Sequence, residues 1–124
     1  MGLMVIATYR PKPGKEADLL QCVRDHMPIL REQKLVADRP AYAMRAKDGT
    51  IVEVFEWLSS SAVEQAHKNA AVRQLWERFG ACCDCIPLTS LAETKETFPH
   101  FEPIDLPTNV KFSGATSDAW GAVD

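Results

Sequence analysis

The sequence predicts an α+β fold, because residues 3–91 read as strand, helix, strand, strand, helix and strand in that order. The strand-like runs are apolar on both faces, and apolar residues recur every three or four residues along the helical runs. Asp48 and Gly49 stand between two of the strand-like runs, and this dipeptide is a strong hairpin signal. The order is that of a ferredoxin-like βαββαβ domain, with a four-stranded antiparallel sheet and helices on one face.

The length of 124 residues suits one domain, which we place at residues 1–93. Residues 94–124 form a tail that we expect to be extended and partly packed on the body or on a partner subunit. Its apolar residues alternate with prolines: Phe98, Pro99, Phe101, Pro103, Ile104 and Pro107.

Composition and charge exclude several classes of partner. The net charge is −3 without a block of like charges, so we expect no nucleic-acid partner. No apolar run approaches the ~20 residues that cross a bilayer, so we expect no membrane partner. The chain enters a strand at once, without the basic start of a signal peptide. The four cysteines then indicate reduced thiols, and we expect a cytoplasmic protein.

The first strand, Leu3–Arg10, is apolar on both faces, which is typical of a central strand covered on both sides. A helix follows at about Lys15–Lys34. Helices on one face of the sheet leave the other face uncovered, so we expect a homodimer that forms through the free face.

Two further strands flank the hairpin. Arg39–Lys47 has a weak pattern and a proline at its start, which favours an edge strand. Thr50–Trp57 reads as a central strand, and Glu53 stands among its apolar residues, which is unusual.

The second helical region changes the direction of its apolar stripe. The stripes before Asn69 and after Ala71 point about 140° apart at 100° per residue, so we expect a break between these residues. Ser59–Ser61 supplies candidates for the helix N-cap, and Ser61 with Glu64 fits a capping box. Gly80 is a candidate helix stop. The last strand is expected at Ile86–Leu91, again at an edge because of its early proline.

Several of these residues fall into a known pattern. Trp57-Leu58-Ser59 ends a strand, His67 follows, and Ala71-Val72-Arg73-Gln74-Leu75-Trp76 comes next. Over residues 3–92 the chain resembles the antibiotic biosynthesis monooxygenase (ABM) family of the dimeric α+β barrel superfamily. The resemblance implies a dimer with a pocket between sheet and helices. By position, Trp57 and His67 correspond to pocket residues of that family.

The best-known members of that family oxidise quinols or polyphenolic polyketides with O₂ and without metal or flavin. Others degrade haem, and many have no assigned activity. The haem branch needs an asparagine on the first strand and a late-helix histidine, and this chain has Leu75 or Trp76 at the second position. The resemblance therefore implies a cofactor-independent monooxygenase acting on a quinol or polyphenolic aromatic, with no cofactor and no metal.

Three residues are candidates for proton transfer. His67 lies on the edge of an apolar helical stripe, where it serves as an acid/base or as a half-buried histidine bonded to backbone. His26 borders the first helix's apolar strip and either lines the same pocket or is partly exposed. Glu53 acts as an acid/base or pairs with Arg10 or Arg45 across the sheet.

Aromatic residues and thiols complete the candidates. A slot for a flat aromatic ligand would use Trp57, Tyr42, Phe55 and Trp76, and the alternative is plain core and dimer contact. Cys82, Cys83 and Cys85 would hold a soft metal or cycle through a disulfide, or simply fill buried space. Their spacing is not that of redox or zinc motifs, which favours the last interpretation.

Three hypotheses follow. The first is a cofactor-independent oxygenase in which His67 is the base and Trp57 the stacking wall. The second is a non-catalytic dimeric module that binds a small aromatic or apolar ligand, or is purely structural. The third, a metal- or haem-binding protein, ranks last because no ligand set has standard spacing.

Overall fold

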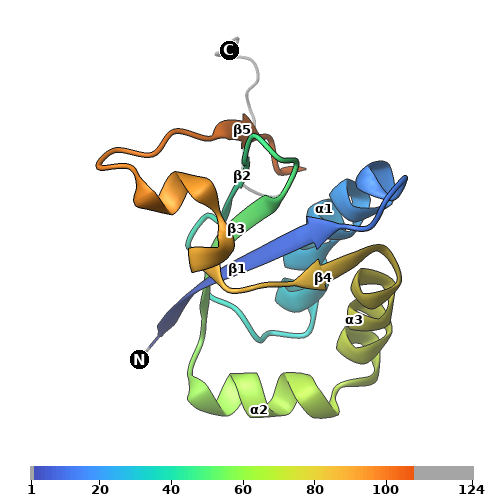
Figure 1. Cartoon of the computed structure of the whole chain (residues 1–124). Helices are drawn as coiled ribbons and strands as arrows, with labels where there is room; N and C mark the ends of the chain where they lie inside the picture. The colour runs from blue at the N-terminus through green and yellow to red at the C-terminus, as the bar shows by residue number, and fades with distance from the viewer. Residues whose placement is uncertain (1, 108–124) are drawn as a thin grey trace, which may run out of the picture.

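The computed structural model describes residues 2–107 and contains one antiparallel sheet packed against three helices (Figure 1). The strands lie in the order β4-β1-β3-β2-β5, and every neighbouring pair is antiparallel. The strands are β1 (Leu3–Pro11), β2 (Tyr42–Arg45), β3 (Ile51–Trp57), β4 (Cys83–Cys85) and β5 (Glu102–Ile104). The helices are α1 (Glu16–Glu32), α2 (Ser60–Lys68) and α3 (Ala70–Cys82), followed by the short 3-10 helices η1 (Leu88–Ser90) and η2 (Ala92–Lys95).

The α+β class is therefore confirmed, with a fifth strand that the sequence did not predict. This strand, β5, belongs to the predicted tail and pairs with β2, where Ala43 faces Ile104 and Arg45 faces Glu102. The expectation that β2 is an edge strand was wrong, because β5 covers its free side. The rest of the tail, residues 108–124, lies outside the described residues.

The main core lies between the sheet and the helices. It contains the apolar stripes of α1 and α3 together with the residues of β1 and β3 that face them. A second, smaller core lies on the opposite face, where Leu91 packs with Ala46 and Val52. The carboxylate of Glu93 holds this segment in place by accepting a hydrogen bond of 2.9 Å from the backbone nitrogen of Lys47.

The break in the second helical region is confirmed at Asn69. Its backbone is extended (φ −87°, ψ 125°), so α2 ends and α3 begins around this one residue. The side-chain oxygen of Asn69 accepts a hydrogen bond from the nitrogen of Val72, which caps α3. At the start of α2 the capping residue is Ser59, the first of the three predicted candidates, whose hydroxyl accepts from the nitrogen of Ala62. The capping box that starts at Ser61 is not formed, because Ser61 already lies inside the helix.

The last strand of the βαββαβ order lies at Cys83–Cys85, earlier in the chain than the predicted Ile86–Leu91. Gly80 does not stop α3, which continues to Cys82 and passes directly into β4. Residues 88–90 form η1 instead of a strand, because Pro87 has no N–H with which to extend the ladder and starts a turn. Among the described residues, no helix has the length and apolarity required to span a membrane.

Candidate functional site

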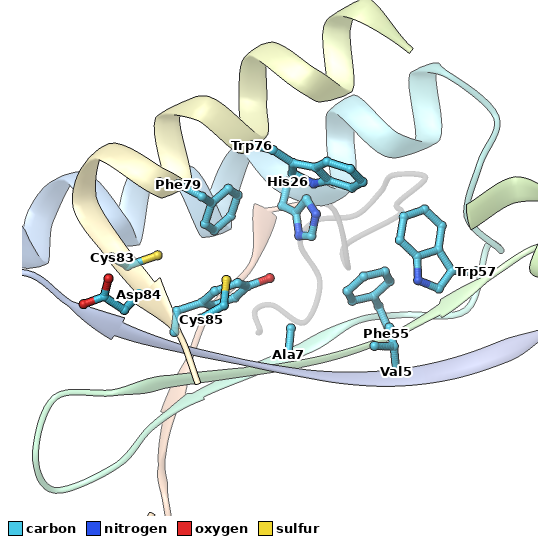
Figure 2. A pocket seen from close by; sticks show the side chains of 12 residues that line it. Val5, Ala7, His26, Phe55, Trp57, Trp76, Phe79, Cys83, Asp84 and Cys85 are labelled. Carbon is cyan, nitrogen blue, oxygen red and sulfur yellow. The ribbon is translucent and has the colours of Figure 1, made fainter. Parts of the chain in front are cut away.

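A pocket with a cavity of about 490 Å³ lies between the sheet and the helices (Figure 2). Its walls come from β1, α1, β3, α3 and β4. The lining residues are Val5, Ala7, Tyr9, His26, Phe55, Trp57, Trp76, Phe79, Gly80, Cys83, Asp84 and Cys85. Half of these residues carry an aromatic ring, counting the imidazole of His26. The volume of the cavity is in the range that holds a small organic ligand.

Glu53 lies behind this lining, fully buried at 0% exposure on the helix-facing side of β3. The sheet register places Ala7 on one side of it and Ala43 on the other. Because both neighbours are small, the carboxylate has room for partners that come from elsewhere in the fold. Its oxygen Oε1 accepts hydrogen bonds from the hydroxyl of Tyr9 and from Nδ1 of His26, each at 2.8 Å.

The alternative in which Glu53 pairs with Arg10 or Arg45 is therefore wrong. Arg45 forms an ion pair of 3.0 Å with Glu102 across the β2–β5 edge. Arg10 faces the opposite side of the sheet from Glu53, because side chains alternate along β1.

His26 connects Glu53 to the pocket. It lies on α1 at 3% exposure, between the rings of Phe55 and Phe79, whose centroids are each 5.2 Å away. When the Glu53 carboxylate accepts the hydrogen of Nδ1, the other ring nitrogen, Nε2, is the acceptor of the neutral imidazole. Within the described residues neither this Nε2 nor Oε2 of Glu53 has a hydrogen-bond partner. Buried polar atoms without partners are costly, so they are candidates for contact with a ligand or water.

Tyr9 completes the buried cluster, and the sequence did not indicate this role. Burial raises the pKa of Tyr9 well above its ordinary value, and the negative charge of Glu53 raises it further. At neutral pH the phenol therefore stays protonated and donates its hydrogen to Glu53. The sequence alone gives no signal for it, because the register that places Ala7, two residues before Tyr9, directly opposite Glu53 is a tertiary contact.

Two predicted site residues lie elsewhere. His67 is exposed on α2 and is not among the residues that line the pocket. Its Nδ1 donates a hydrogen bond of 2.9 Å to the carbonyl of Val63, and its ring contacts Trp76 edge-on at 5.0 Å. Tyr42 is on the opposite face of the sheet and is 66% exposed. The other predicted residues, His26, Phe55, Trp57 and Trp76, line one pocket, and Glu53 contacts it through His26.

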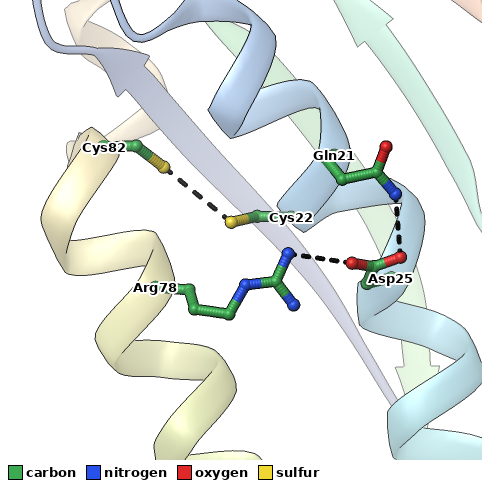
Figure 3. A network of polar contacts seen from close by, with 5 residues as sticks. All are labelled: Gln21, Cys22, Asp25, Arg78 and Cys82. Atoms are coloured by element: carbon green, nitrogen blue, oxygen red, sulfur yellow. Dashed lines mark hydrogen bonds and ion pairs between the residues drawn. The ribbon is translucent and has the colours of Figure 1, made fainter.

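The cysteine cluster is divided by the end of α3. Cys83 and Cys85 line the pocket, whereas Cys82 turns toward Cys22 of α1, with 3.9 Å between the two sulfur atoms (Figure 3). Burial raises the pKa of Cys22 to about 11 and that of Cys83 to about 12. Among the three neighbouring cysteines, Cys82 thus turns away from the pocket that Cys83 and Cys85 line. In the part of the chain that the structure describes, no three His, Cys, Asp or Glu residues are placed to hold a metal ion.

Figure 3 also shows how α1 and α3 are joined beside this thiol pair. The guanidinium of Arg78 donates to a carboxylate oxygen of Asp25 at 2.8 Å, and Gln21 donates to the other oxygen at 3.0 Å. These contacts hold the helix that carries Trp76 and Phe79 against the helix that carries His26. The shape of the pocket depends on this helix pair.

Comparison with known proteins identifies no matching family model, no similar curated protein and no similar solved structure. The function is therefore inferred from the pocket and its buried polar cluster.

Proposed function

We propose that the pocket binds a flat phenolic aromatic and oxidises it with O₂, without a metal or organic cofactor. The strongest support is that the buried Tyr9–Glu53–His26 cluster reaches an aromatic-lined cavity through His26. The lining offers ring surfaces for stacking, and His26 offers one basic nitrogen in an apolar wall.

The chemistry needs few protein groups. His26 takes the phenolic proton on Nε2, and the charge of Glu53 stabilises the imidazolium that forms. The resulting phenolate is electron-rich and transfers electrons to O₂ itself. In the overall reaction a ring C–H and the phenolic O–H are replaced by two quinone carbonyls. One oxygen atom of O₂ enters the ring and the other leaves as water, so the electrons balance.

The pocket wall supports this role in two further ways. Phe55, Trp57 and Trp76 hold the ring and exclude water from the reactive phenolate and its O₂ adduct. Tyr9 and His26 donate to the same oxygen of Glu53, which fixes the imidazole ring in one orientation. A base held in place lowers the entropic cost of the proton transfer.

The test is O₂ consumption on a panel of naphthols and quinols, with His26→Gln compared to His67→Ala. We expect His26→Gln to lower the rate by about 10²- to 10⁴-fold, which is the usual contribution of a general base. His67→Ala is the matched histidine control outside the lining and should retain most of the activity. Full activity in His26→Gln would remove His26 from the mechanism, and loss only in His67→Ala would return the role to His67.

The second hypothesis, a module that binds a ligand without oxidising it, predicts a different result from the same panel. Naphthols would then quench the fluorescence of Trp57 and Trp76, but no O₂ would be consumed. Binding without O₂ uptake over the whole panel would favour this function.

We also propose that the protein is a ferredoxin-like homodimer. The strand order β4-β1-β3-β2 and the antiparallel pairing support the ferredoxin-like arrangement. The free part of the sheet supports a dimer, because Met4, Ile6 and Tyr42 are exposed there at 58%, 51% and 66%. Ile6 faces Val54, which in turn faces Tyr42, so these residues form one apolar row across three strands. A second copy with the same row is a self-complementary partner.

A further inference from the structure

Two thiols lie in the pocket wall at its β4 end. Cys83 and Cys85 are separated by one residue, so they project on the same side of β4, and both line the cavity (Figure 2). Cys83 is buried, whereas Cys85 is exposed. Cys85 is also the direct neighbour of Tyr9 in the sheet register, which places it next to the residue that donates to Glu53.

We propose that Cys85 is a covalent capture site for electrophilic aromatics, above all quinones, that occupy the pocket. The aromatic lining formed by Phe55, Trp57 and Trp76 binds the ring of such a compound, and the thiol stands in the same cavity. The proposal rests on the proposed function only in that a quinone would be the reaction product; the capture itself needs no O₂.

A second observation also points to a ligand in this cavity. Nε2 of His26 is buried and has no partner among the described residues, although His26 belongs to the lining. In the imidazolium form, which the Glu53 carboxylate stabilises, Nε2 carries a hydrogen that a quinone carbonyl accepts, while the ring extends between the aromatic walls. The cavity thus presents one polar contact, stacking surfaces and a nucleophile.

The reaction is a conjugate addition. The sulfur of Cys85 forms a bond to a ring carbon of the quinone, and the thiol proton passes to a quinone oxygen. Loss of the ring hydrogen to the second oxygen then gives a sulfur-substituted hydroquinone. The quinone is reduced as the S–C bond forms, so no further oxidant or reductant is required.

The local electrostatics make this capture selective. Burial raises the pKa of Cys85, partly offset by a hydrogen bond with the Cys83 thiol, so little thiolate is present at neutral pH. A small electrophile that gains nothing from the pocket therefore reacts slowly. An aromatic electrophile that is held beside the thiol gains from proximity.

The experiment compares two reagents on the intact protein under argon, with 1,4-naphthoquinone as the aromatic probe and iodoacetamide as the small one. Labelling at Cys85 is followed by peptide mass spectrometry and divided by the rate for a synthetic peptide of residues 80–90. We expect this folded-to-peptide ratio to be below one for iodoacetamide and at least about tenfold higher for naphthoquinone. Ratios within about threefold of each other would overturn the proposal, because the pocket would then contribute nothing.

Two controls link the labelling to the pocket. Trp76→Leu should lower the naphthoquinone rate and leave the iodoacetamide rate unchanged. If that variant does not fold, competition by 2-naphthol on the unchanged protein makes the same test. Cys22 and Cys82 lie outside the lining and are internal controls. Fast naphthoquinone labelling without O₂ uptake on phenols would retain the capture site and discard the oxygenase, and the reverse result would do the opposite.

Discussion

On the side of the sheet that faces the helices, β3 presents Glu53 between two alanines, whereas its neighbours Val52 and Val54 point to the other side. Glu53 is fully buried and bonded to Tyr9 and His26. The opposite side divides into two parts. One part is covered by the chain's own residues 88–101, through Leu91 against Val52, and the other part exposes apolar side chains.

This distribution differs on both faces from that of a monomer with a simple core. Such a protein places charge on its uncovered face and only apolar side chains on its covered face. Here a carboxylate is buried and an isoleucine, a methionine and a tyrosine are exposed. The difference supports our proposals that the covered face carries the chemistry and that the open face forms the dimer contact.

The largest expected effect concerns the covered face. Glu53→Ala leaves Tyr9 and His26 without their shared acceptor, so we expect the free energy of unfolding to fall by about 3–5 kcal/mol. Urea denaturation followed by tryptophan fluorescence measures this loss. Glu53→Gln keeps the acceptor oxygen and is the matched control, with a smaller loss expected. An unchanged midpoint for Glu53→Ala would show that the cluster does not stabilise the fold.

The next effect concerns the open face. Ile6→Ser removes an apolar side chain from the proposed dimer contact in both protomers, at about 1–2 kcal/mol each. We expect the dissociation constant of the dimer to rise by about 30- to 1,000-fold in sedimentation experiments. Val5→Ser, one residue earlier and on the covered face, should affect folding and leave association largely unchanged. A monomeric parent protein at micromolar concentration would contradict the proposed dimer directly.

The pH dependence of the folding stability tests the covered face through Tyr9, with Tyr42 on the open face as the control. The folded pKa of Tyr9 is raised above its ordinary value of 10.0, mainly by burial. The unfolded state therefore loses this proton first as the pH rises, so the stabilisation is complete below pH 10.0 and is lost as the pH rises toward the folded pKa. Tyr9→Phe should reduce this alkaline loss and lower neutral-pH stability by about 1.5–3 kcal/mol. Tyr42→Phe, on the open face, controls for the removal of a phenol.

The smallest effect tests the helical wall of the pocket. A Cβ added at Gly80 meets no atom within 4 Å, so Gly80→Ala should stabilise α3 by about 0.5–1 kcal/mol. Thermal unfolding followed by circular dichroism measures the gain. Gly49 has φ +93°, so Gly49→Ala at the hairpin should destabilise the protein instead. Destabilisation by Gly80→Ala would indicate that the wall has no spare room.

Local patterns predicted much of the fold. The break at Asn69 was predicted because two apolar stripes cannot face one surface along a straight helix. The fifth strand was missed because residues 102–104 are short and contain Pro103, and only pairing with β2 makes them a strand. The late placement of β4 has the same cause, since its pairing with residues 9–11 of β1 is a tertiary contact.

The candidate site was predicted in part for a similar reason. Glu53 was noticeable because a carboxylate in an apolar strand needs partners. Its partners could not be predicted, because Tyr9, Glu53 and His26 are far apart in sequence and meet only through the sheet register and the packing of α1. His67 was favoured because it borders an apolar stripe and because of a resemblance in sequence position, but no residue of α2 is among those that line the pocket.

The junctions around α3 have a consequence for how this protein can change over evolution. One residue separates α2 from α3, and no residue separates α3 from β4. An insertion or deletion at either end of α3 would turn the helix by 100° or move each β4 side chain to the other face. This side of the pocket therefore has a fixed chain length. New ligand preferences would arise by substitution of single lining residues, and changes in length would be confined to the hairpin and the segment after β4.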